Sequence, residues 1–282
     1  MMKHSRLMRC SRIYAGVLVL LFFVVCSWGN CAQHSSQLVA VAVQENASPL
    51  HVRQAAYTPR SRIQFAHPGT ELAHLTPEAQ GFVPPPGKIF FISAFGDSLI
   101  SGYGLDNAMD AFPVVLQDSL RELGYSVVVD NDGIAGNTTA QGRVRLSKIL
   151  LTKPDIIIME LGANDMLQRR NVVRMKSDLA AMIREIQDMD IRLLLTGMYS
   201  LPHFGKKYAE MFDAVFPDLA AKYNVSFYPF FLEGVALDHS LNQKDGHHPN
   251  GAGVRVLVHN ILPYVVKQIK LICTENACKF GG

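Results

Sequence analysis

A repeated pattern that begins at Lys88 constrains the fold more than any other feature of this sequence. From that point on, short apolar runs alternate with longer amphipathic stretches. Such runs are typical of strands buried on both faces, in a parallel sheet that helices cover. The runs are residues 89–94, 126–130, 155–160, 192–196 and 225–228. The pattern therefore predicts an α/β domain of three layers, α/β/α, built on a five-stranded parallel sheet.

The stretches between these runs carry apolar residues at helical spacing. The stripe within residues 112–123 stops at Gly124, which is suited to a left-handed helix cap. Similar stripes occupy residues 172–186, 211–219 and 254–265. Pro217 should kink the helix that contains it. We expect all four stripes to face the core and not a cofactor.

The first 32 residues have the pattern of an export signal. Basic residues up to Arg12 precede an uncharged apolar run, 13–25, which is followed by small and polar residues around Ser27, Gly29 and Ala32. This run is shorter than the roughly 20 residues that a spanning helix needs. We therefore expect a signal peptide (1–32) that is removed, leaving a periplasmic or secreted protein without a stable membrane span. An uncleaved membrane anchor is the alternative.

The segment between residues 33 and 87 alternates small, polar and proline residues and ends in Pro-Pro-Pro-Gly. It lacks helical and strand periodicity, so we interpret it as a flexible linker. The catalytic domain then spans 88–272, and 273–282 form a C-terminal tail. Within this tail, Cys273 and Cys278 either close a small disulfide loop or stay free thiols.

The net charge argues against a nucleic-acid partner. It is +3 over 282 residues, but the basic leading segment carries Lys3, Arg6, Arg9 and Arg12. The rest of the chain is nearly neutral and offers no electrostatic basis for binding nucleic acid. Glycine-rich nucleotide-binding motifs are also missing from the sequence.

Polar and glycine-rich segments follow the first three apolar runs. Gly96-Asp97-Ser98 follows the first run, residues 133–137 follow the second, and residues 162–165 follow the third. In open α/β sheets, ligands bind beyond the carboxyl ends of the strands. We therefore expect these three segments to meet at one functional site.

Ser98 is the candidate nucleophile. A serine hydroxyl attacks well only when a base takes its proton, and the base works best when a carboxylate orients and stabilises it. Asp245 and His248 supply both partners, because a separation of three residues lets the carboxylate reach one ring nitrogen and leaves the other for Ser98. An isolated Asp-x-x-His segment is more often a solvated loop, and Gly-Asp-Ser alone is often a turn.

Acyl transfer also needs hydrogen-bond donors for the oxygen that becomes negative. Three donors are candidates: the backbone N–H groups of Ser98 and Gly136 and the side-chain amide of Asn164. At Gly136 the missing Cβ would let a substrate approach the backbone. The alternative is that Gly136 and Asn164 only shape their loops.

Together these residues resemble the SGNH (GDSL) hydrolases, whose name lists the same four residue types: Ser98, Gly136, Asn164 and His248. The resemblance is closest to the small bacterial periplasmic branch with thioesterase, arylesterase and lysophospholipase activities. It covers residues 88–269, including the segments 95–99, 159–165 and 245–250. It implies a flavodoxin-like fold, a triad with Asp245, and Gly136 and Asn164 as oxyanion donors.

This interpretation predicts hydrolysis of a small acyl ester or thioester through an acyl-serine intermediate, without a metal or other cofactor. Apolar residues after the strands are expected either to hold the acyl chain or to belong to the core; they are Met166, Leu167, Met198, Leu201 and Phe204. Two alternatives remain. One is a metal-dependent hydrolase that uses Asp245, His247 and His248, and the other is a non-catalytic envelope module that binds acylated glycans or lipids.

Overall fold

The computed structural model describes residues 72–82 and 84–279, with side chains as far as residue 275. The expected signal peptide and most of the expected linker lie outside the described residues.

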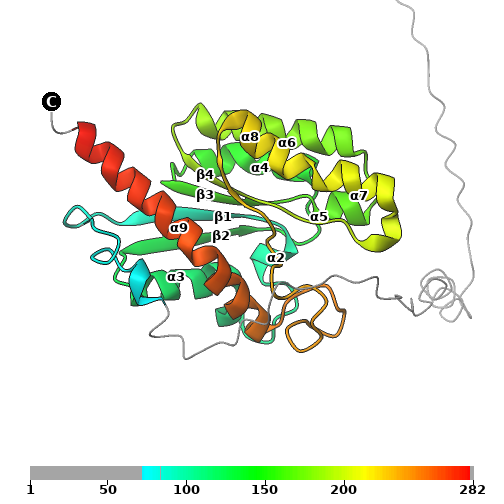
Figure 1. Cartoon of the computed structure of the whole chain (residues 1–282), viewed down its shortest axis with the longest axis horizontal. Helices are drawn as coiled ribbons and strands as arrows, with labels where there is room; N and C mark the ends of the chain where they lie inside the picture. The colour runs from blue at the N-terminus through cyan, green and yellow to red at the C-terminus, as the bar shows by residue number, and fades with distance from the viewer. Residues whose placement is uncertain (1–71, 83, 280–282) are drawn as a thin grey trace, which may run out of the picture. The chain divides into compact units, whose positions relative to one another are not determined.

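The described chain forms the expected five-stranded parallel sheet (Figure 1). Its strand order is β2-β1-β3-β4-β5, and every adjacent pair is parallel. The strands are β1 (Phe90–Gly96), β2 (Val127–Gly133), β3 (Ile156–Glu160), β4 (Arg192–Thr196) and β5 (Ser226–Tyr228). All five predicted strands are therefore confirmed, although β1 and β2 run on to a paired glycine, Gly96 and Gly133, beyond their expected ends.

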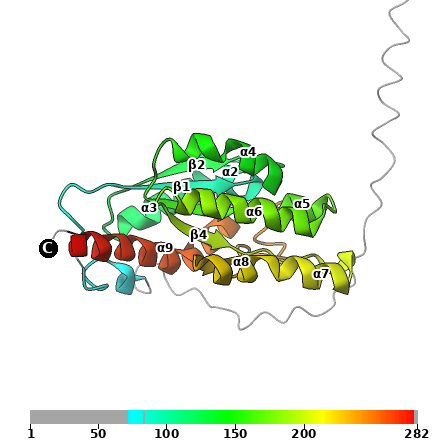
Figure 2. The same cartoon turned by 90° about the horizontal axis from the view of Figure 1, so that it is seen from above.

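Helices cover both faces of the sheet and complete the predicted α/β/α arrangement (Figures 1 and 2). On one face, α3 (Phe112–Glu122) packs against α9 (Gly251–Lys279). On the other, α6 (Val172–Gln187) packs against α4 (Thr139–Leu150) and α8 (Val215–Tyr223). The shorter helices are α2 (Ser98–Ser101), α5 (Ala163–Leu167), α7 (Lys206–Asp213), η1 (Ala73–Leu75), η2 (Ala108–Asp110) and η3 (Pro202–Phe204).

The central strands supply the middle of the core. Every residue of β3 is buried. Ile92 on β1, Ile157 on β3 and Leu194 on β4 are fully inaccessible to solvent. Burial of this kind explains why the strands appear in the sequence as continuous apolar runs rather than alternating ones. The helices bury their apolar stripes on this sheet, as their spacing predicts.

The expected single helix around Pro217 is instead two helices. Helix α7 ends at Asp213, and α8 begins at Val215 after a cap at Ala214. Pro217 then lies in the first turn of α8, where a missing N–H breaks no helical hydrogen bond. The prediction of a kink at Pro217 was wrong, because one helix ends and a second begins before the proline.

The described end of the expected linker packs on the domain. Leu75 is buried in the core, and its carbonyl accepts a hydrogen bond from the Tyr125 hydroxyl at 2.6 Å. Farther along, the Lys270 ammonium donates to the carbonyl of Gln80 at 2.7 Å. The predicted domain start at residue 88 is therefore too late. A few apolar contacts spread among polar residues and prolines produce no sustained periodicity from which the packing could be predicted.

The expected tail is also ordered in part, because α9 continues through Lys279. Cys273 lies within this helix as a half-buried free thiol. Within the described residues, the stretch Gly251–Glu275 is the one helix long and apolar enough to cross a membrane, yet more than half of its apolar window is buried. Leu257, Ile261 and Val265 make it a core helix.

Candidate active site

Ser98 begins α2 directly after β1, in a turn that the preceding residues shape. The Asp97 side chain caps the helix by accepting a hydrogen bond from the Leu99 N–H at 3.0 Å. At Gly96 an added Cβ would lie 2.6 Å from the carbonyl oxygen of Glu160 and 2.3 Å from the side chain of Ile100. Only glycine fits this close approach of two strand ends, and the turn delivers Ser98 to the carboxyl edge of the sheet.

Ser98, His248 and Asp245 form a continuous hydrogen-bonded chain. The distance between Ser98 Oγ and His248 Nε2 is 2.9 Å, and that between His248 Nδ1 and Asp245 Oδ2 is 2.7 Å. The other oxygen of Asp245 accepts the backbone N–H groups of His247 and His248 at 2.9 and 3.0 Å. Asp97 is a poor competitor for the serine, since its Oδ1 is 3.5 Å from Ser98 Oγ. The structure thus brings together residues that are 150 positions apart.

The ionised carboxylate of Asp245 determines which ring nitrogen of a neutral His248 carries the proton. Partial burial opposes ionisation, but hydrogen bonds from the His247 N–H and from the ring and N–H of His248 outweigh it and lower the pKa of Asp245 to about 2. An ionised carboxylate accepts but does not donate, so the proton of a neutral imidazole lies on Nδ1. Nε2 is left with a lone pair toward Ser98, which is the state that a general base needs.

Gln243 ties the histidine loop to the loop that follows α2, and sequence reasoning missed it. Its side-chain amide donates to the carbonyls of Tyr103 and Pro249, both at 2.9 Å, and its backbone N–H donates to the His248 carbonyl at 2.7 Å. A Cβ on Gly104 would lie 2.3 Å from the Gln243 amide oxygen. The ring of Tyr103 packs on His248 with centroids 5.1 Å apart.

The three predicted oxyanion donors line the same pocket as the triad serine and histidine. Gly136 adopts a left-handed conformation with φ of 80°, and no atom lies within 4 Å of the position its Cβ would take. The N–H groups of Ser98 and Gly136 donate no hydrogen bond to another described residue. The Asn164 amide donates one hydrogen bond, to Asp97 Oδ2 at 2.8 Å.

Two side chains of the domain hold the loops that carry Gly136 and Asn164. Arg145 on α4 donates to the Asn137 side chain at 2.9 Å and to the carbonyls of Asp132 and Gly96, both at 2.6 Å. Asp165 accepts both the N–H and the hydroxyl of Thr139, at 2.7 and 2.9 Å. Both loops are therefore braced against α4.

An apolar pocket of about 570 Å³ opens beside Ser98. Of the five predicted acyl-chain residues, Met166, Leu167, Met198 and Leu201 line it, whereas Phe204 does not. The short helix η3 turns Phe204 toward the rings of His203 and Tyr208, with centroids 4.3 and 5.4 Å away, and the Arg169 guanidinium lies over it. Phe204 therefore packs on the core, which is the alternative given for it, and its position after β4 gave no information on that turn.

Several lining residues were missed: Tyr103, Ala135, Tyr199, Phe230, Leu232, Ala236 and Leu237. His247 also lines it. Most of these residues lie in loops, where apolar side chains follow no period. Tyr199 and Phe230 were within reach of prediction, since each comes shortly after the end of a strand, β4 and β5.

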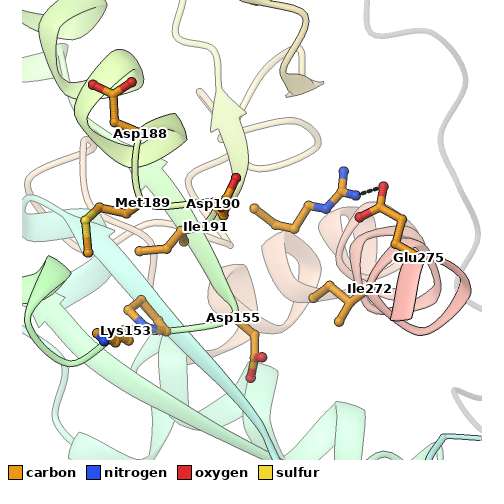
Figure 3. A pocket seen from close by; sticks show the side chains of 10 residues that line it. Lys153, Asp155, Asp188, Met189, Asp190, Ile191, Ile272 and Glu275 are labelled. Carbon is orange, nitrogen blue, oxygen red and sulfur yellow. Dashed lines mark ion pairs between the residues drawn. The ribbon is translucent and has the colours of Figure 1, made fainter. Parts of the chain in front are cut away.

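A second cavity of about 490 Å³ lies at the amino ends of the strands, opposite the end that carries Ser98, and near the start of β4 (Figure 3). Its lining is polar, with Asp155, Asp190 and an ion pair between Arg192 and Glu275. It contains none of the predicted catalytic residues. Across the described part of the chain, no group of three His, Cys, Asp or Glu side chains is placed to hold a metal ion.

Comparison with known proteins places this arrangement in a family. Residues 94–256 match the model of the GDSL-like Lipase/Acylhydrolase family. Esterase TesA of Pseudomonas aeruginosa is 35% identical over 169 residues, which are 60% of this chain and 84% of that protein. Thioesterase 1/protease 1/lysophospholipase L1 of Escherichia coli strain K12 is 33% identical over 156 residues, 55% of this chain and 73% of that protein.

Solved structures agree with the family match. The crystal structure of AlinE4, an SGNH-hydrolase family esterase, superposes with a TM-score of 0.55 at 40% sequence identity, covering 65% of this chain and 98% of AlinE4. The residues matched by the family model, 94–256, include the nucleophile turn, the segments that carry Gly136 and Asn164, and the Asp-x-x-His segment. This chain belongs to the GDSL-like lipase/acylhydrolase family, the SGNH hydrolases.

Proposed function

We propose that this protein hydrolyses carboxylic esters and thioesters through an acyl-Ser98 intermediate. The observation that carries the proposal is the hydrogen-bonded chain from Ser98 through His248 to Asp245, which opens into an apolar pocket. The names of the relatives, an esterase and a thioesterase, support the same reaction class.

In the first half-reaction, Ser98 Oγ attacks the substrate carbonyl carbon and its proton passes to His248 Nε2. Asp245 stabilises the imidazolium that forms, because its Oδ2 already accepts a hydrogen bond from His248 Nδ1, with the two atoms 2.7 Å apart. When the tetrahedral intermediate collapses, the bond from carbon to the leaving oxygen or sulfur breaks. The leaving group takes the proton from Nε2 and departs as an alcohol or thiol.

In the second half-reaction, a water molecule takes the place of the leaving group. His248 Nε2 accepts a proton from this water as its oxygen attacks the acyl carbon. The intermediate then releases the acid, and Ser98 Oγ regains its proton from His248. Water is the only co-reactant, so the atoms balance without an external oxidant or reductant.

The negative oxygen of each tetrahedral intermediate would be held by the N–H groups of Ser98 and Gly136 and by the Asn164 amide. The open surface over Gly136 supports this assignment, since nothing in the domain occupies the space that a Cβ would fill. Donors of this kind are commonly worth about a hundredfold to a thousandfold each in rate.

The acyl part of the substrate would lie along Met166, Leu167, Met198 and Leu201. These side chains belong to α5 after β3 and to the loop after β4, and they line the pocket next to the serine. Their apolar character favours a hydrocarbon acyl group over a charged one.

We also propose export to the periplasm or the medium, on the strength of the basic, apolar and small-residue pattern in residues 1–32. Mass spectrometry of protein recovered from the cell envelope should find an N-terminus near residues 27–32. Protein that retains Met1 to Arg12 would instead support an uncleaved anchor.

One labelling experiment separates the proposed reaction from its alternatives. The full chain should hydrolyse p-nitrophenyl acetate, and a fluorophosphonate should stop the reaction by bonding to Ser98, as peptide mass spectrometry would show. Ser98→Ala is the control and should neither turn over nor react with the label. Inhibition by a chelator without labelling would support a metal-dependent hydrolase, and no turnover on esters or thioesters would support a binding module.

A further inference from the structure

Two carboxyl side chains lie buried beneath the nucleophile turn, and the mechanism above does not use them. Asp97 is fully inaccessible, and Glu160 is 1% exposed. They lie at the ends of adjacent strands: Asp97 follows Gly96, the last residue of β1, and Glu160 is the last residue of β3 and pairs in register with Gly96. Isolated charges in such a place are costly, so the pair calls for an explanation.

Burial raises the pKa of Asp97 too, but its hydrogen bonds oppose this effect and favour ionisation of Asp97 over Glu160. Its Oδ1 accepts the Leu99 N–H at 3.0 Å, and its Oδ2 accepts the Asn164 amide at 2.8 Å. Glu160 accepts a single N–H, that of Asp97, at a long 3.3 Å. Asp97 is therefore surrounded by donors in the manner of a carboxylate, and Glu160 is not.

The two carboxyl groups are also close neighbours, because each side chain acts directly on the pKa of the other. Two buried carboxylates so close together would repel each other, and a hydrogen bond between them needs one partner to be a neutral acid. Burial, together with the charge of Asp97, raises the pKa of Glu160 well above its usual range. The Arg145 guanidinium, whose charge also acts on Asp97, donates to main-chain carbonyls and to Asn137, so neither acid has an ion-pair partner among the described residues.

The glycine of the Gly-Asp-Ser turn makes room for this pair. A Cβ on Gly96 would lie 2.8 Å from Glu160 Oε2, so any larger residue would push the carboxyl group away from Asp97. The absence of a side chain at Gly96 therefore leaves space for the Glu160 carboxyl group and also allows the turn.

We propose that Glu160 is a positioning residue of the oxyanion hole: as a neutral acid it donates to Asp97, and Asp97 in turn fixes the side-chain amide of Asn164. An amide has two N–H donors. With one held by Asp97, the plane of the group is set and the other is available to the substrate oxygen. This inference rests on the proposed function of Asn164.

The first test compares two substitutions of Glu160 with similar volume. Glu160→Gln keeps a donor for Asp97 and an acceptor for its N–H, so kcat on p-nitrophenyl acetate should stay within about threefold of the wild type. Glu160→Met has neither group, so kcat should fall about tenfold or more with little change in KM, as expected for an interaction made in the transition state.

Asp178→Asn provides a matched control. Asp178 is another buried carboxyl group of the same domain, but it lies on α6 and its partners are Arg143 and Arg174. The quantity compared is kcat, not stability. The kcat of Asp178→Asn should match that of the wild type even if its melting temperature falls. An equal loss of kcat in Asp178→Asn and Glu160→Met would show a general effect of disturbing the core, and would overturn the proposal.

A double-mutant cycle tests the route through Asn164. If Glu160 acts by way of this amide, Glu160→Met should change kcat less than about twofold once Asn164→Ala is present, because coupled residues do not add their losses. A further tenfold loss in the double variant would show that Glu160 acts elsewhere. A loss in Glu160→Gln as large as that in Glu160→Met would contradict the donor role.

A spectroscopic measurement keeps the test independent of both folding and catalysis. The infrared difference spectrum of wild type minus Glu160→Gln at pH 7 should contain the carbonyl band of a buried, protonated carboxyl group. A spectrum with only carboxylate bands would overturn the proposal, even if Glu160→Met failed to fold. Absence of ester hydrolysis in the wild type would instead count against the proposed function. The infrared spectrum would still report whether Glu160 is protonated.

Discussion

At the scale of single residues, two adjacent histidines follow Asp245, and the triad can use one of them as base. The ring of His248 bridges Asp245 and Ser98, whereas His247 contributes its backbone N–H to Asp245 and lines the pocket. The two side chains thus differ in role although both lie beside the nucleophile.

We therefore predict opposite results for the two alanine variants. His248→Ala should lower kcat by several orders of magnitude, about as much as Ser98→Ala, and the double variant should be scarcely worse, because triad members act as one unit. His247→Ala should retain substantial turnover. The measurement is kcat of all four variants on one activated ester, with folding checked by circular dichroism. An inactive His247→Ala beside an active His248→Ala would reverse the assignment.

The sequence was sufficient to name candidate residues that the structure then brings together. Ser98, Asp245, His248, Gly136 and Asn164 were chosen from motifs and from the resemblance to a family, and all five lie at one edge of the sheet. Gln243 and Glu160 were out of reach, because a glutamine or a glutamate has many uses. Their roles depend on neighbours such as Tyr103 and Asp97, which lie 140 and 63 residues away along the chain.

At the scale of elements, the turn after β5 holds one residue in a strained conformation at the pocket. Leu237 has a φ of 66°, a region that costs a side chain with a Cβ roughly 1 kcal/mol or more. The buried side chain of Asn242 imposes the turn by donating to the carbonyls of Val235 and Asp238, at 2.7 and 2.8 Å. Leu237 is 62% exposed and lines the pocket, so its side chain gains little from burial in the fold.

We predict that Leu237→Asn separates stability from activity. Asparagine tolerates this conformation, so the melting temperature should rise by roughly 1–4 °C. The pocket loses an apolar wall, so kcat/KM for p-nitrophenyl decanoate should fall about fivefold to tenfold while that for the acetate changes little.

Lys153→Asn is the matched control for this prediction. Lys153 also has a positive φ, 48°, but lies at the polar cavity at the amino ends of the strands (Figure 3). It should show the rise in melting temperature without any change in chain-length preference. Equal chain-length profiles for wild type and Leu237→Asn would remove Leu237 from the acyl site.

Elements with strong periodicity were predicted well, and those decided by local turns were not. The central strands were visible because both of their faces are buried, which leaves an unbroken apolar run such as residues 156–159. The break at Ala214 was not visible, since the apolar stripe continues across it. The place of Phe204 was not visible either, because a short 3-10 helix turns it away from the pocket.

At the scale of the whole molecule, the boundary of the domain was the hardest feature to predict. Residues 72–82 carry one buried leucine, Leu75, and two partly buried apolar side chains that also pack on the core, while their hydrogen bonds depend on Tyr125 and Lys270 from distant parts of the chain. A pattern search needs regular repetition, and so few anchors supply none. These contacts nevertheless make the segment part of the packed domain.

The last prediction compares two truncated chains, one starting at residue 72 and one at residue 88. Removing residues 72–87 takes Leu75 from the core, worth roughly 1.5–3 kcal/mol, and leaves the buried Tyr125 hydroxyl without its acceptor, roughly 1–3 kcal/mol more. The shorter chain should therefore melt about 5–15 °C lower. Both chains should hydrolyse p-nitrophenyl acetate equally at low temperature, because Leu75 and Tyr125 do not line the pocket that contains Ser98. Tyr125→Phe in the longer chain isolates the hydroxyl and should show only part of the shift. Equal melting temperatures for the two truncated chains would mean that the domain begins at residue 88 after all.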